Sequence, residues 1–512
     1  MEQKIGNGNL PINWAVCNLD DILLKISNGA NVTQYDEKVG YPISRIETIW
    51  NQGIDLDRVK YIKENDADFV EKYSLQHGDV LLSHINSDAH LGKTGVFKNQ
   101  VKTLIHGINI LLIRPVSNIN SDFLNFQFNH LRTKGGFVDI AQRSVNQSSV
   151  NQRKLKSLQI IVPPLAEQHR IVAKIEELFS ELDKGIENLK TARAQLKVYR
   201  QALLKHAFEG KLTAEWREQN KDKLETASAL QQRIQTERAA RYQQQLTDWQ
   251  ATGQKGSKPK APKPLPPLTN DELADLPELS EGWIYTRFGL VIDEPTYGTS
   301  KKCDYEIEGT GVLRIPNVVS GRIDASDLKH AQFTDDEIAT YKLNTGDILI
   351  IRSNGSVSIV GRCAVVSEND TKFLYAGYLI RLRPNKLLVE SRYLLNIFSL
   401  HSTRKQIELK AKSTSGVNNI NTGEIQSLII SLCGIKEQKV IVEYLEARLS
   451  EVDQLDQSIT IALQQSEALR QSILKKAFSG ALVPQEANDE PASVLLARIK
   501  SEQFSNKIRA KS

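Results

Sequence analysis

The sequence that decides the fold lies at residues 167–210 and reads EQHRIVAKIEELFSELDKGIENLKTARAQLKVYRQALLKHAFEG. It contains no proline, and before its final residue it contains one glycine, Gly185. Large apolar residues recur in it at intervals of seven, at Ile175, Leu182, Leu189, Leu196 and Leu203. An apolar period of seven over this length predicts one long helix with a coiled-coil seam.

The flanking residues set the limits of this helix. Pro163 and Pro164 lie directly upstream, and proline disfavours helix in the residues before it, so we expect the helix to begin after them. Gly210 suits the C-terminal end, because glycine readily adopts the left-handed conformation that closes a helix. At about 1.5 Å per residue, about 42 helical residues extend roughly 63 Å.

The same features recur 270 positions later, where Glu437-Gln438 matches Glu167-Gln168 and Ala477-Phe478-Ser479-Gly480 matches Ala207-Phe208-Glu209-Gly210. The corresponding spaced series is Leu445, Val452, Ile459, Ser466 and Ile473. Solenoid repeats are far shorter, so this offset indicates two copies of a whole domain plus a helix. Two such helices can pair and hold two domains apart, which suits a target with two separated parts.

Each long helix follows a segment with the pattern of a mixed, strand-rich domain. In residues 1–165, short apolar runs such as 79–82 and 108–113 alternate with glycine, asparagine and proline, which predicts strands and turns. Residues 281–432 carry the same landmarks in the same order. The pairs are Trp14 and Trp283, Gly78-Asp79 and Gly346-Asp347, and Arg114-Pro115 and Arg383-Pro384.

Three other segments complete the expected domain organisation. Residues 166–225 form the first helix region, and residues 433–505 form the second with a short C-terminal helix. Residues 226–280 combine a short amphipathic helix with a lysine- and proline-rich stretch that includes KPKAPKP at 258–264. We interpret this stretch as a solvated, extended linker between the two halves, with contact between its lysines and a DNA backbone as the lesser alternative.

Bulk properties indicate a soluble globular protein. The 512 residues are 40% hydrophobic and 25% charged, and the formal net charge of +5 is mildly basic without demonstrating nucleic-acid binding. The N-terminal residues are polar and no apolar run has the length of a membrane span, so we expect a cytoplasmic protein. We expect free thiols in a reducing compartment at Cys17, Cys303, Cys363 and Cys433.

The sequence lacks the signatures of catalysis. Leu91-Gly92-Lys93-Thr94 resembles the end of a phosphate-binding loop, but the required upstream glycine is replaced by Ser87. The second copy has Gly361-Arg362 at the equivalent place, so this pair belongs to a strand or turn of the fold. There is no dinucleotide fingerprint, no Asn-Pro-Pro-aromatic methyltransferase segment and no metal-binding spacing of histidines. We therefore predict a non-catalytic chain without a metal site.

Polar segments at equivalent places in the two copies carry residues suited to reading DNA bases. These segments follow the same landmarks in both copies while their polar side chains differ, which is expected if each copy reads a different short DNA sequence. The alternative is that these are solvated or structural loops. The run at 143–152 is expected to lie directly before the long helix, and in that alternative it only passes the chain from sheet to helix. The candidate DNA-binding residues are Arg45, Ser83, His84, Asn86, Lys93, Arg143, Asn146, Gln147, Arg314, Arg352, Ser353, Asn354, Arg362, Lys412, Asn418 and Asn419.

Together these features resemble the specificity subunit of Type I restriction–modification systems. The strongest match is Val162-Pro163-Pro164-Leu165-Ala166-Glu167-Gln168, followed by Ile171-Val172 and the seven-residue period. The segment from Ala207 to Thr213 and the Gly-Asp-apolar strand of each half are also similar, and the likeness covers almost the whole chain. The second helix departs from the family pattern, with Cys433-Gly434 in place of the proline pair.

The resemblance implies an α+β fold with two β-rich target recognition domains, joined by two long helices that form an antiparallel coiled coil. Each domain would read one half of a bipartite, asymmetric site on double-stranded DNA. The helices would set the spacing and dock two modification subunits, with contacts along Ile175, Leu182, Leu189, Leu196, Leu203, Leu445, Val452, Ile459 and Ile473.

The resemblance also assigns the chemistry to partner subunits. The modification subunits would bind S-adenosylmethionine and methylate adenine N6, and restriction subunits would use ATP and Mg²⁺, so no cofactor is expected in this chain. A fused specificity–methylase or specificity–nuclease chain is disfavoured by the missing motifs. A coiled-coil scaffold that reads no sequence is disfavoured by the unequal polar residues on equal frames.

Overall fold

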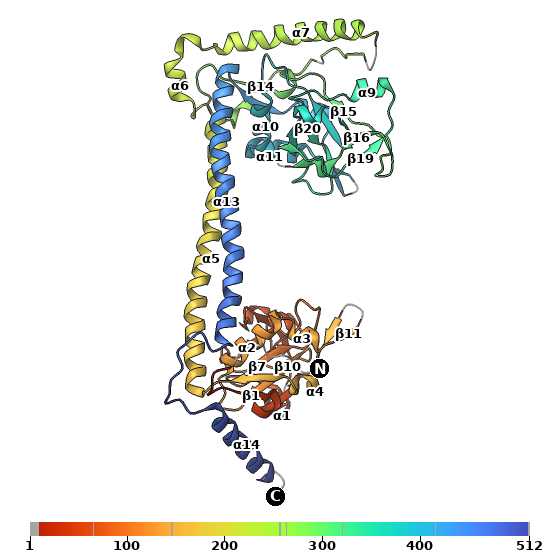
Figure 1. Ribbon diagram of the computed structural model, residues 1–512. Coiled ribbons are helices and arrows are strands. Elements are labelled where there is room, and N and C mark those ends of the chain that lie inside the picture. Colours follow the sequence, from red (N-terminus) through yellow and green to blue (C-terminus); the bar gives the residue numbers. More distant parts are fainter. Residues whose placement is uncertain are drawn as a thin grey trace. The chain divides into compact units, whose positions relative to one another are not determined.

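The computed structural model describes residues 10–64, 66–144, 147–254, 258–262, 264–319, 321–414 and 416–509. The chain forms two compact units (Figure 1). The first unit contains Met1–Thr191 and Ile459–Ser512, and the second contains Ala192–Ser458. Each unit combines one β-rich domain with parts of both long helices, so the predicted α+β class is confirmed.

The first β domain is built on a four-stranded antiparallel sheet in the order β2-β10-β7-β9. Strands β7 (Val80–Ser83) and β10 (Ile110–Pro115) occupy its centre, and their apolar side chains are buried, as the sequence predicts. Strands β2 (Leu23–Asn28) and β9 (Thr94–Val96) form the edges. Strand β1 (Ala15–Asn18) pairs with β13 (Gln159–Val162), which joins the start of the domain to its end.

Shorter elements complete this domain. Short 3-10 helices span Leu19–Ile22, Ile46–Thr48 and Leu56–Arg58. The remaining strands are β3 (Tyr41–Ile43), β4 (Ile49–Trp50), β5 (Gly53–Ile54), β6 (Lys60–Ile62), β8 (Ile85–Asn86), β11 (Gln142–Ser144) and β12 (Gln147–Ser149). The helices are α1 (Ala67–Tyr73), α2 (Ser121–Thr133), α3 (Gly136–Asp139) and α4 (Gln152–Lys156).

The second β domain repeats this architecture. Its central sheet has the order β15-β24-β20-β22, with β20 (Ile348–Ile351) and β24 (Leu379–Leu382) buried in the middle. Strand β14 (Ile284–Arg287) pairs with β27 (Ile429–Leu432), as β1 pairs with β13. The other strands are β15 (Thr296–Tyr297), β16 (Thr310–Leu313), β17 (Val318–Val319), β18 (Arg322–Ile323), β19 (Lys329–Ala331), β21 (Ser353–Asn354), β22 (Cys363–Val365), β23 (Leu374–Tyr375), β25 (Lys412–Thr414) and β26 (Val417–Asn419). The helices are α9 (Asp335–Tyr341), α10 (Ser391–Ser399), α11 (His401–Lys410) and α12 (Thr422–Gln426), with 3-10 turns at Phe288–Leu290, Ile315–Asn317 and Glu368–Asp370.

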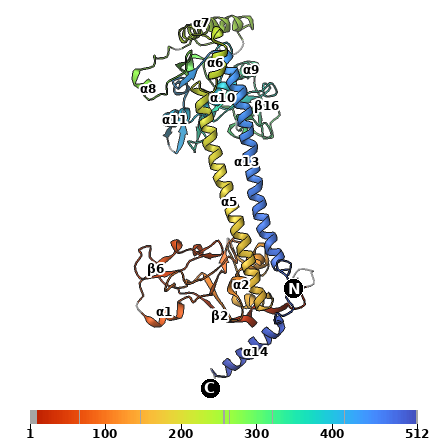
Figure 2. The ribbon, with the colours of Figure 1, turned by 90° about the vertical axis from the view of Figure 1, so that its left-hand side faces the viewer.

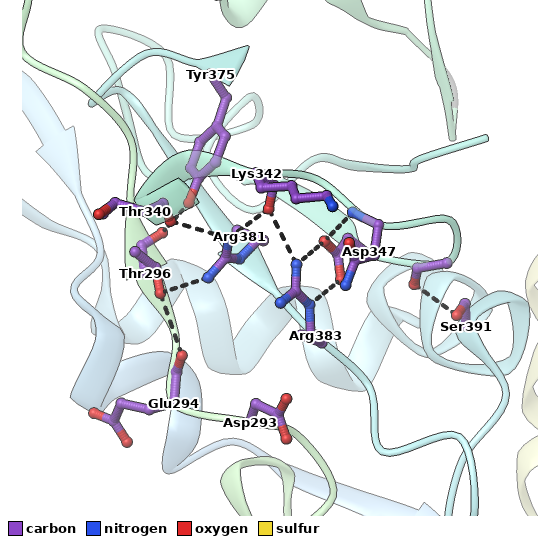
Figure 3. Close-up of polar contacts among 12 residues, drawn as sticks. Asp293, Glu294, Thr296, Thr340, Lys342, Asp347, Tyr375, Arg381, Arg383 and Ser391 are labelled. Atoms are coloured by element: carbon purple, nitrogen blue, oxygen red, sulfur yellow. Dashed lines mark hydrogen bonds and ion pairs between the residues drawn. The ribbon is translucent and has the colours of Figure 1, made fainter. Parts of the chain in front are cut away.

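A buried ion pair follows the glycine turn in both central sheets. Gly78 and Gly346 have φ values of +85° and +92°, which glycine adopts at low cost. The aspartate after each glycine accepts two hydrogen bonds from an arginine on the neighbouring strand. In the first domain Arg114 Nε lies 2.6 Å from Asp79 Oδ1. In the second, which Figure 3 shows, Arg383 Nε lies 2.8 Å from Asp347 Oδ1. The Gly-Asp and Arg-Pro landmarks of the sequence therefore belong together, because they form one glycine turn and one ion pair in each domain.

Helix α5 (Leu165–Phe208) begins directly after the proline pair, and helix α13 (Ile435–Ala477) lies 270 positions later, so both predicted long helices are confirmed. In the first unit Ile175 of α5 shares a buried cluster with Ile473 of α13, and α2 packs against the same part of α5 (Figure 2). In the second unit Leu203 shares a cluster with Leu445. The start of each helix thus meets the end of the other, and the pairing is antiparallel.

The seam is less buried along the middle of α5. Leu182, Leu189 and Leu196 are partly exposed, whereas Val452 and Ile459 of α13 are buried. Arginine–aspartate pairs between the two helices lie beside the seam. Arg193 Nε lies 2.8 Å from Asp456 Oδ1, and Arg200 pairs with Asp453 in the second unit. In the first unit Arg470 pairs with Asp183.

Both long helices start on a buried glutamate and glutamine. Glu167 accepts a 2.9 Å hydrogen bond from the indole Nε1 of Trp14, and Glu437 accepts one of 3.2 Å from Trp283. Gln168 Nε2 donates to the carbonyl of Pro163, and Gln438 Nε2 donates to that of Cys433. The bond pattern is unchanged where the second copy lacks the proline pair, so that departure from the family pattern leaves the helix start intact.

The shorter helices pack on the β domains. In the first unit α14 (Ala492–Arg509) buries Leu495 and Ile499 against Leu19 and Ile22. In the second unit Leu230 and Ile234 of α7 (Ala227–Ala251) join the core (Figure 1). The short helix expected at the start of 226–280 is longer than predicted, because its second half is rich in glutamine, alanine and arginine, which favour helix. Helices α6 (Ala214–Gln219) and α8 (Asn270–Ala274), with a 3-10 turn at Lys221–Lys223, complete this region.

The proline-rich linker is held against the second domain at one end. Its described residues form no helix or strand between 258 and 262 or between 264 and 269, and residues 255–257 and Lys263 lie outside the described range. Arg287 donates hydrogen bonds to the carbonyls of Pro266 and Pro267, which fixes the end of the linker beside β14. The linker and α7 border an apolar hollow of about 1220 Å³. Pro264, Pro266 and Pro267 are exposed, so this end of the linker is solvated and extended as expected, and the contacts with Arg287 tether it to the second domain.

The four cysteines are free, as predicted. Within the described part of the chain, no helix has both the length and the apolar character required to cross a membrane.

The two tryptophan–glutamate contacts predict unequal effects of the same substitution. Trp14→Phe leaves Glu167 with Gln485 Nε2 as its donor, whereas after Trp283→Phe the carboxylate of Glu437 keeps Thr213 and Arg217. We expect Trp14→Phe to destabilise the first unit by about 1–3 kcal/mol and Trp283→Phe to destabilise the second unit by less. Hydrogen exchange of each unit measures both changes, and equal losses of protection would contradict the expectation.

The pH dependence of the Trp14→Phe effect follows from the pKa of Glu167. Burial raises the pKa of this carboxyl above its usual value of 4.5, while the indole hydrogen bond opposes that shift. A raised folded-state pKa means that stability is lost as pH rises above about 4.5. Removing the indole donor raises the pKa further, so the deficit of Trp14→Phe should be larger at pH 8 than at pH 5.

Candidate nucleic-acid interface

Candidate segments that are distant in sequence form one small sheet in each β domain. In the first, Ser148 of β12 pairs with Asn86 of β8, and β12 also pairs with β11. In the second, Asn418 of β26 pairs with Asn354 of β21, and β26 pairs with β25. The run at 143–152 is therefore mainly a β-hairpin. Helix α4 and strand β13 separate it from α5, so the expectation that it lies directly before the long helix is wrong.

A hollow of about 440 Å³ in the first β domain brings three of the candidates together. Arg45, Asn86 and Lys93 lie on different segments, and all three line it. Arg45 is partly exposed and lies 3.4 Å from the carboxylate of Glu47. Burial, and then the charge of Arg132, lowers the pKa of Lys93. Two or more cations around a hollow attract the acceptor groups of a nucleic acid.

Two other candidates in this domain, Ser83 and His84, are buried. Ser83 is fully buried, and its Oγ accepts a 3.1 Å hydrogen bond from Asn86 Nδ2. His84 is 8% exposed, and burial lowers its pKa to about 4. Ser83 has no accessible surface, so it does not contact DNA in this conformation, and we correct the expectation of direct contact for Ser83. His84 keeps a small exposed surface, and its contact stays a prediction. The central strand β7 buries Ser83 together with the rest of its side chains.

The hairpin of the first β domain carries the remaining candidates. Arg143 is exposed, and its guanidinium lies 3.7 Å from Asp88. Ser148 donates a short hydrogen bond to the same carboxylate, which ties the hairpin to the loop after β8. Gln147 is exposed on β12. Asn146 lies outside the described residues, so its candidate role stays a prediction.

In the second β domain two candidate arginines, Arg352 and Arg314, each contact a polar side chain and an aromatic ring. Arg352 Nε donates to Asn419 Oδ1 at 3.1 Å, and its guanidinium lies 4.6 Å from the ring centroid of Tyr297. Arg314 lies 3.2 Å from the carboxylate of Asp327 and 5.6 Å from the ring centroid of Tyr305. Such contacts fix the direction of an arginine fork, which is otherwise costly to order.

The other candidates of this domain lie on the same small sheet or beside it. Ser353 and Asn354 form β21, and Asn418 Nδ2 donates to the carbonyl of Gly355 at 3.0 Å. Arg362 is exposed and donates to the carbonyl of Ser358. Lys412 begins β25, and its side chain lies outside the described residues.

The glycine–basic pairs that resemble a phosphate loop are turns. Gly92 and Gly361 have φ values of +74° and +80° and directly precede the residues that lead into β9 and β22. No helix follows either glycine, so neither presents a helix N-terminus to a phosphate. Across the described ranges, no group of three or more histidine, cysteine, aspartate or glutamate side chains is arranged to hold a metal ion.

The sequence reasoning missed the aromatic and cationic residues beside these sites. Trp50 and Arg58 line the first hollow together with Gln34, His90 and Asn109. Trp50 is 54% exposed on the short hairpin β4–β5. An exposed tryptophan directly before Asn51-Gln52-Gly53 was the signal available in the sequence. In the second domain the missed residues are Tyr297 and Tyr305, which lie against candidate arginines.

Comparison with known proteins agrees with this geometry. The family model for the Type I restriction modification DNA specificity domain matches residues 11–191 and 299–465, which include most of both β domains. The chain belongs to this family. It is a specificity subunit of a type I restriction–modification system, a DNA-recognition subunit that itself performs no catalysis.

Individual relatives match part or all of the chain. The MjaX specificity subunit of Methanocaldococcus jannaschii is 39% identical over 210 residues, which are 40% of this chain and 49% of that protein. This chain therefore spans about half the length of that relative. The EcoKI specificity subunit of Escherichia coli is 24% identical over 97% of this chain and 96% of its own length.

Solved structures share the fold. A chain from a study of complex assembly and conformational transition of the type I R-M system has a TM-score of 0.63 at 18% identity. It aligns with 92% of this chain and 99% of its own length. The HsdS subunit of Thermoanaerobacter tengcongensis has a TM-score of 0.50 at 18% identity, over 94% of this chain and 100% of its own.

Arg352 provides a test of the second site. We expect Arg352→Ala to weaken binding of the target DNA by about 1–3 kcal/mol, because an oriented arginine fork is lost. Fluorescence anisotropy with the duplex target measures the change. Arg241→Ala is the control, since Arg241 is likewise an arginine of the second unit held by a side-chain acceptor, the carboxylate of Asp293, but lies on α7. Equal losses in the two variants would count against a DNA contact by Arg352.

Proposed function

We propose that each β domain reads one half of a bipartite, asymmetric DNA site. The observation that carries this proposal is the pair of small sheets with the same strand order and different polar residues. Ser148 of the first sheet stands where the second has Asn418, while their strand partners, Asn86 and Asn354, are of the same type. Equal frames hold the reading residues in comparable positions, and unequal side chains offer different donors and acceptors to base edges.

We further propose that the long helices set the number of base pairs between the two half-sites. Helix α5 begins in the first unit and ends in the second, and α13 runs through them in the opposite order. The seam and the arginine–aspartate pairs oppose sliding of one helix along the other, because a shift separates every pair at once. The seam residues from Ile175 to Ile473 are thus spacer residues in this proposal.

We infer the partner subunits from the two-fold repeat within the chain. Two modification subunits dock on the helices and β domains, and restriction subunits join them in the cytoplasm. Tyr199 of α5 and Leu469 of α13 support two equivalent docking surfaces. They lie 270 positions apart and are 48% and 52% exposed. S-adenosylmethionine, ATP and Mg²⁺ are assigned to those partners, and no cofactor is assigned to this chain.

Genome-wide adenine methylation tests the function directly. The chain is expressed with its modification subunit in a host without adenine methylation, and methylated sites are mapped. We expect a two-part motif that disappears when this chain is omitted, because the modification subunit then lacks its address. Failure to find a chain-dependent motif from an assembled complex would refute the proposal.

A matched pair of insertions tests the spacer. One heptad is inserted after Leu189 in α5 and one after Thr460 in α13, between the Arg470–Asp183 pair and the Arg193–Asp456 pair. Seven residues add about 10 Å, so the unspecified gap should lengthen by about three base pairs while both half-sites stay the same. Insertions of four residues at the same places shift the seam out of phase and should abolish methylation. A motif with an unchanged gap after the heptad insertions would disprove the spacer role.

A further inference from the structure

The two β domains share a small frame around the hairpin that follows the first candidate arginine. Strand β4 pairs with β5 in the first domain, and β17 pairs with β18 in the second, 269 positions later. Thr48 Oγ1 donates to the carbonyl of Arg58 at 3.0 Å, and Asn317 Nδ2 donates to the carbonyl of Asp327 at 2.8 Å. Arg58 and Asp327 therefore occupy the same position of the same frame with opposite charges.

Arg58 is held by two neighbours. Its Nε donates to Asp55 Oδ2 at 2.9 Å, and its guanidinium carbon lies 4.0 Å from the ring centroid of Trp50. Asp55 itself is fixed, because its other oxygen accepts from the backbone of Asp57. With Asp55 on the Nε edge and the ring against one face, the end of the fork formed by Nη1 and Nη2 is the part available to another acceptor. The arginine side chain is 43% exposed.

The surroundings of Arg58 favour an electron-rich ligand. It lines the same hollow as Arg45 and Lys93, and Glu47 is the acidic residue among the lining side chains. An arginine fork that is already ordered loses little further entropy when it binds two adjacent acceptors. DNA offers such pairs at the O6 and N7 atoms of guanine and at phosphate oxygens.

The second domain uses the equivalent position differently. Asp327 Oδ2 lies 3.2 Å from Arg314 Nη2, and this nitrogen also lies 3.4 Å from the hydroxyl of Tyr305. Arg314 corresponds to Arg45, so an acidic residue here neutralises the arginine that in the first domain faces the hollow. The same position thus carries a cation, Arg58, in the first domain, whereas in the second it carries Asp327, which partly neutralises the charge of Arg314.

We propose that Arg58, oriented by Trp50 and Asp55, contacts DNA in the first β domain, and that Asp327 at the equivalent position restrains Arg314 in the second. The proposal rests on the proposed function, because DNA is the ligand. Trp50 and Asp55 are positioning residues that act through Arg58.

The first test is Arg58→Ala in the full chain assembled with its modification subunit. Binding to a duplex with the mapped methylation motif is measured over a range of salt concentrations. We expect affinity to fall about tenfold or more. Lys63→Ala is a matched control, because Lys63 also contacts a carboxylate and a ring, those of Glu37 and Tyr35, yet is absent from the hollow. Unchanged binding by Arg58→Ala, or an equal loss in Lys63→Ala, would overturn the proposal.

Two measurements distinguish guanine from phosphate as the group contacted. A guanine contact predicts that Arg58→Ala accepts other bases at one position of the first half-site and that Arg58→Lys does not restore the discrimination. A phosphate contact predicts a uniform loss across sequences, a salt slope smaller by about 1, and recovery by Arg58→Lys. Either pattern supports the contact, since both require the fork of Arg58 to touch DNA.

The positioning role is tested in a double-mutant cycle. Asp55→Asn should weaken DNA binding in the wild-type background and have little further effect in Arg58→Ala, because its action passes through Arg58. Trp50→Ala should behave in the same way. Additive losses would show that these residues do not act through Arg58, and that part of the proposal would be rejected.

The restraint in the second domain is tested by Asp327→Asn. Releasing Arg314 should strengthen binding of the duplex and raise the salt slope by about 1, because one more cation faces the DNA. Unchanged or weakened binding would overturn the restraint. A wild-type complex without any chain-dependent motif would instead refute the proposed function. If the wild-type complex reads its motif and the Arg58→Ala variant binds the duplex equally well, this inference is refuted and the proposed function is not.

Discussion

The structure depends on one buried contact that occurs twice, an indole N–H that donates to a carboxylate in the first turn of a long helix. Glu167 and Glu437 are almost fully buried, and a buried carboxylate is costly unless donors surround it. Trp14 and Trp283 provide those donors from the start of each β domain, so the contact fixes the direction in which each helix leaves its domain. Gln168 and Gln438 strengthen this arrangement, because their side chains accept from Asn120 and Glu390, which begin the helices α2 and α10. Every role assigned to the long helices requires this fixed junction.

Much of this architecture was predictable because its physical signals are periodic or duplicated. The seven-residue series located both helices, and the proline pair and Gly210 located the ends of the first. The central strands β7 and β10 were predictable because their apolar runs are short and bounded by turn residues. The offset of 270 then transferred each assignment to the second copy. The strand pairing of Ser148 with Asn86 was beyond reach, since a contact over that separation depends on tertiary structure rather than on local pattern.

The candidate interface shows where residue type alone is insufficient. Ser83 and Asn86 have similar chemistry and lie three positions apart, yet one is buried in a central strand and the other lines the hollow. Trp50 was overlooked because tryptophan is more often a core residue than an exposed one. The shared position of Arg58 and Asp327 was also hidden in the sequence, because it is defined by strand pairing and by side-chain hydrogen bonds to backbone carbonyls. The same hydrogen-bonded position therefore carries an arginine in one domain and an aspartate in the other without a change in the surrounding strands.

The packing of α14 has a consequence for the order in which the protein is made. Leu495 and Ile499, close to the end of the sequence, complete a core that contains Leu19 and Ile22, and Ala492 N–H donates to the carbonyl of Asn13. The second unit is continuous from Ala192 to Ser458, so it can finish folding while the last residues are still being synthesised. The domain that leaves the ribosome first is therefore the last to close. Until then the apolar surface around Leu19 is uncovered, and transiently exposed surface of this kind favours aggregation.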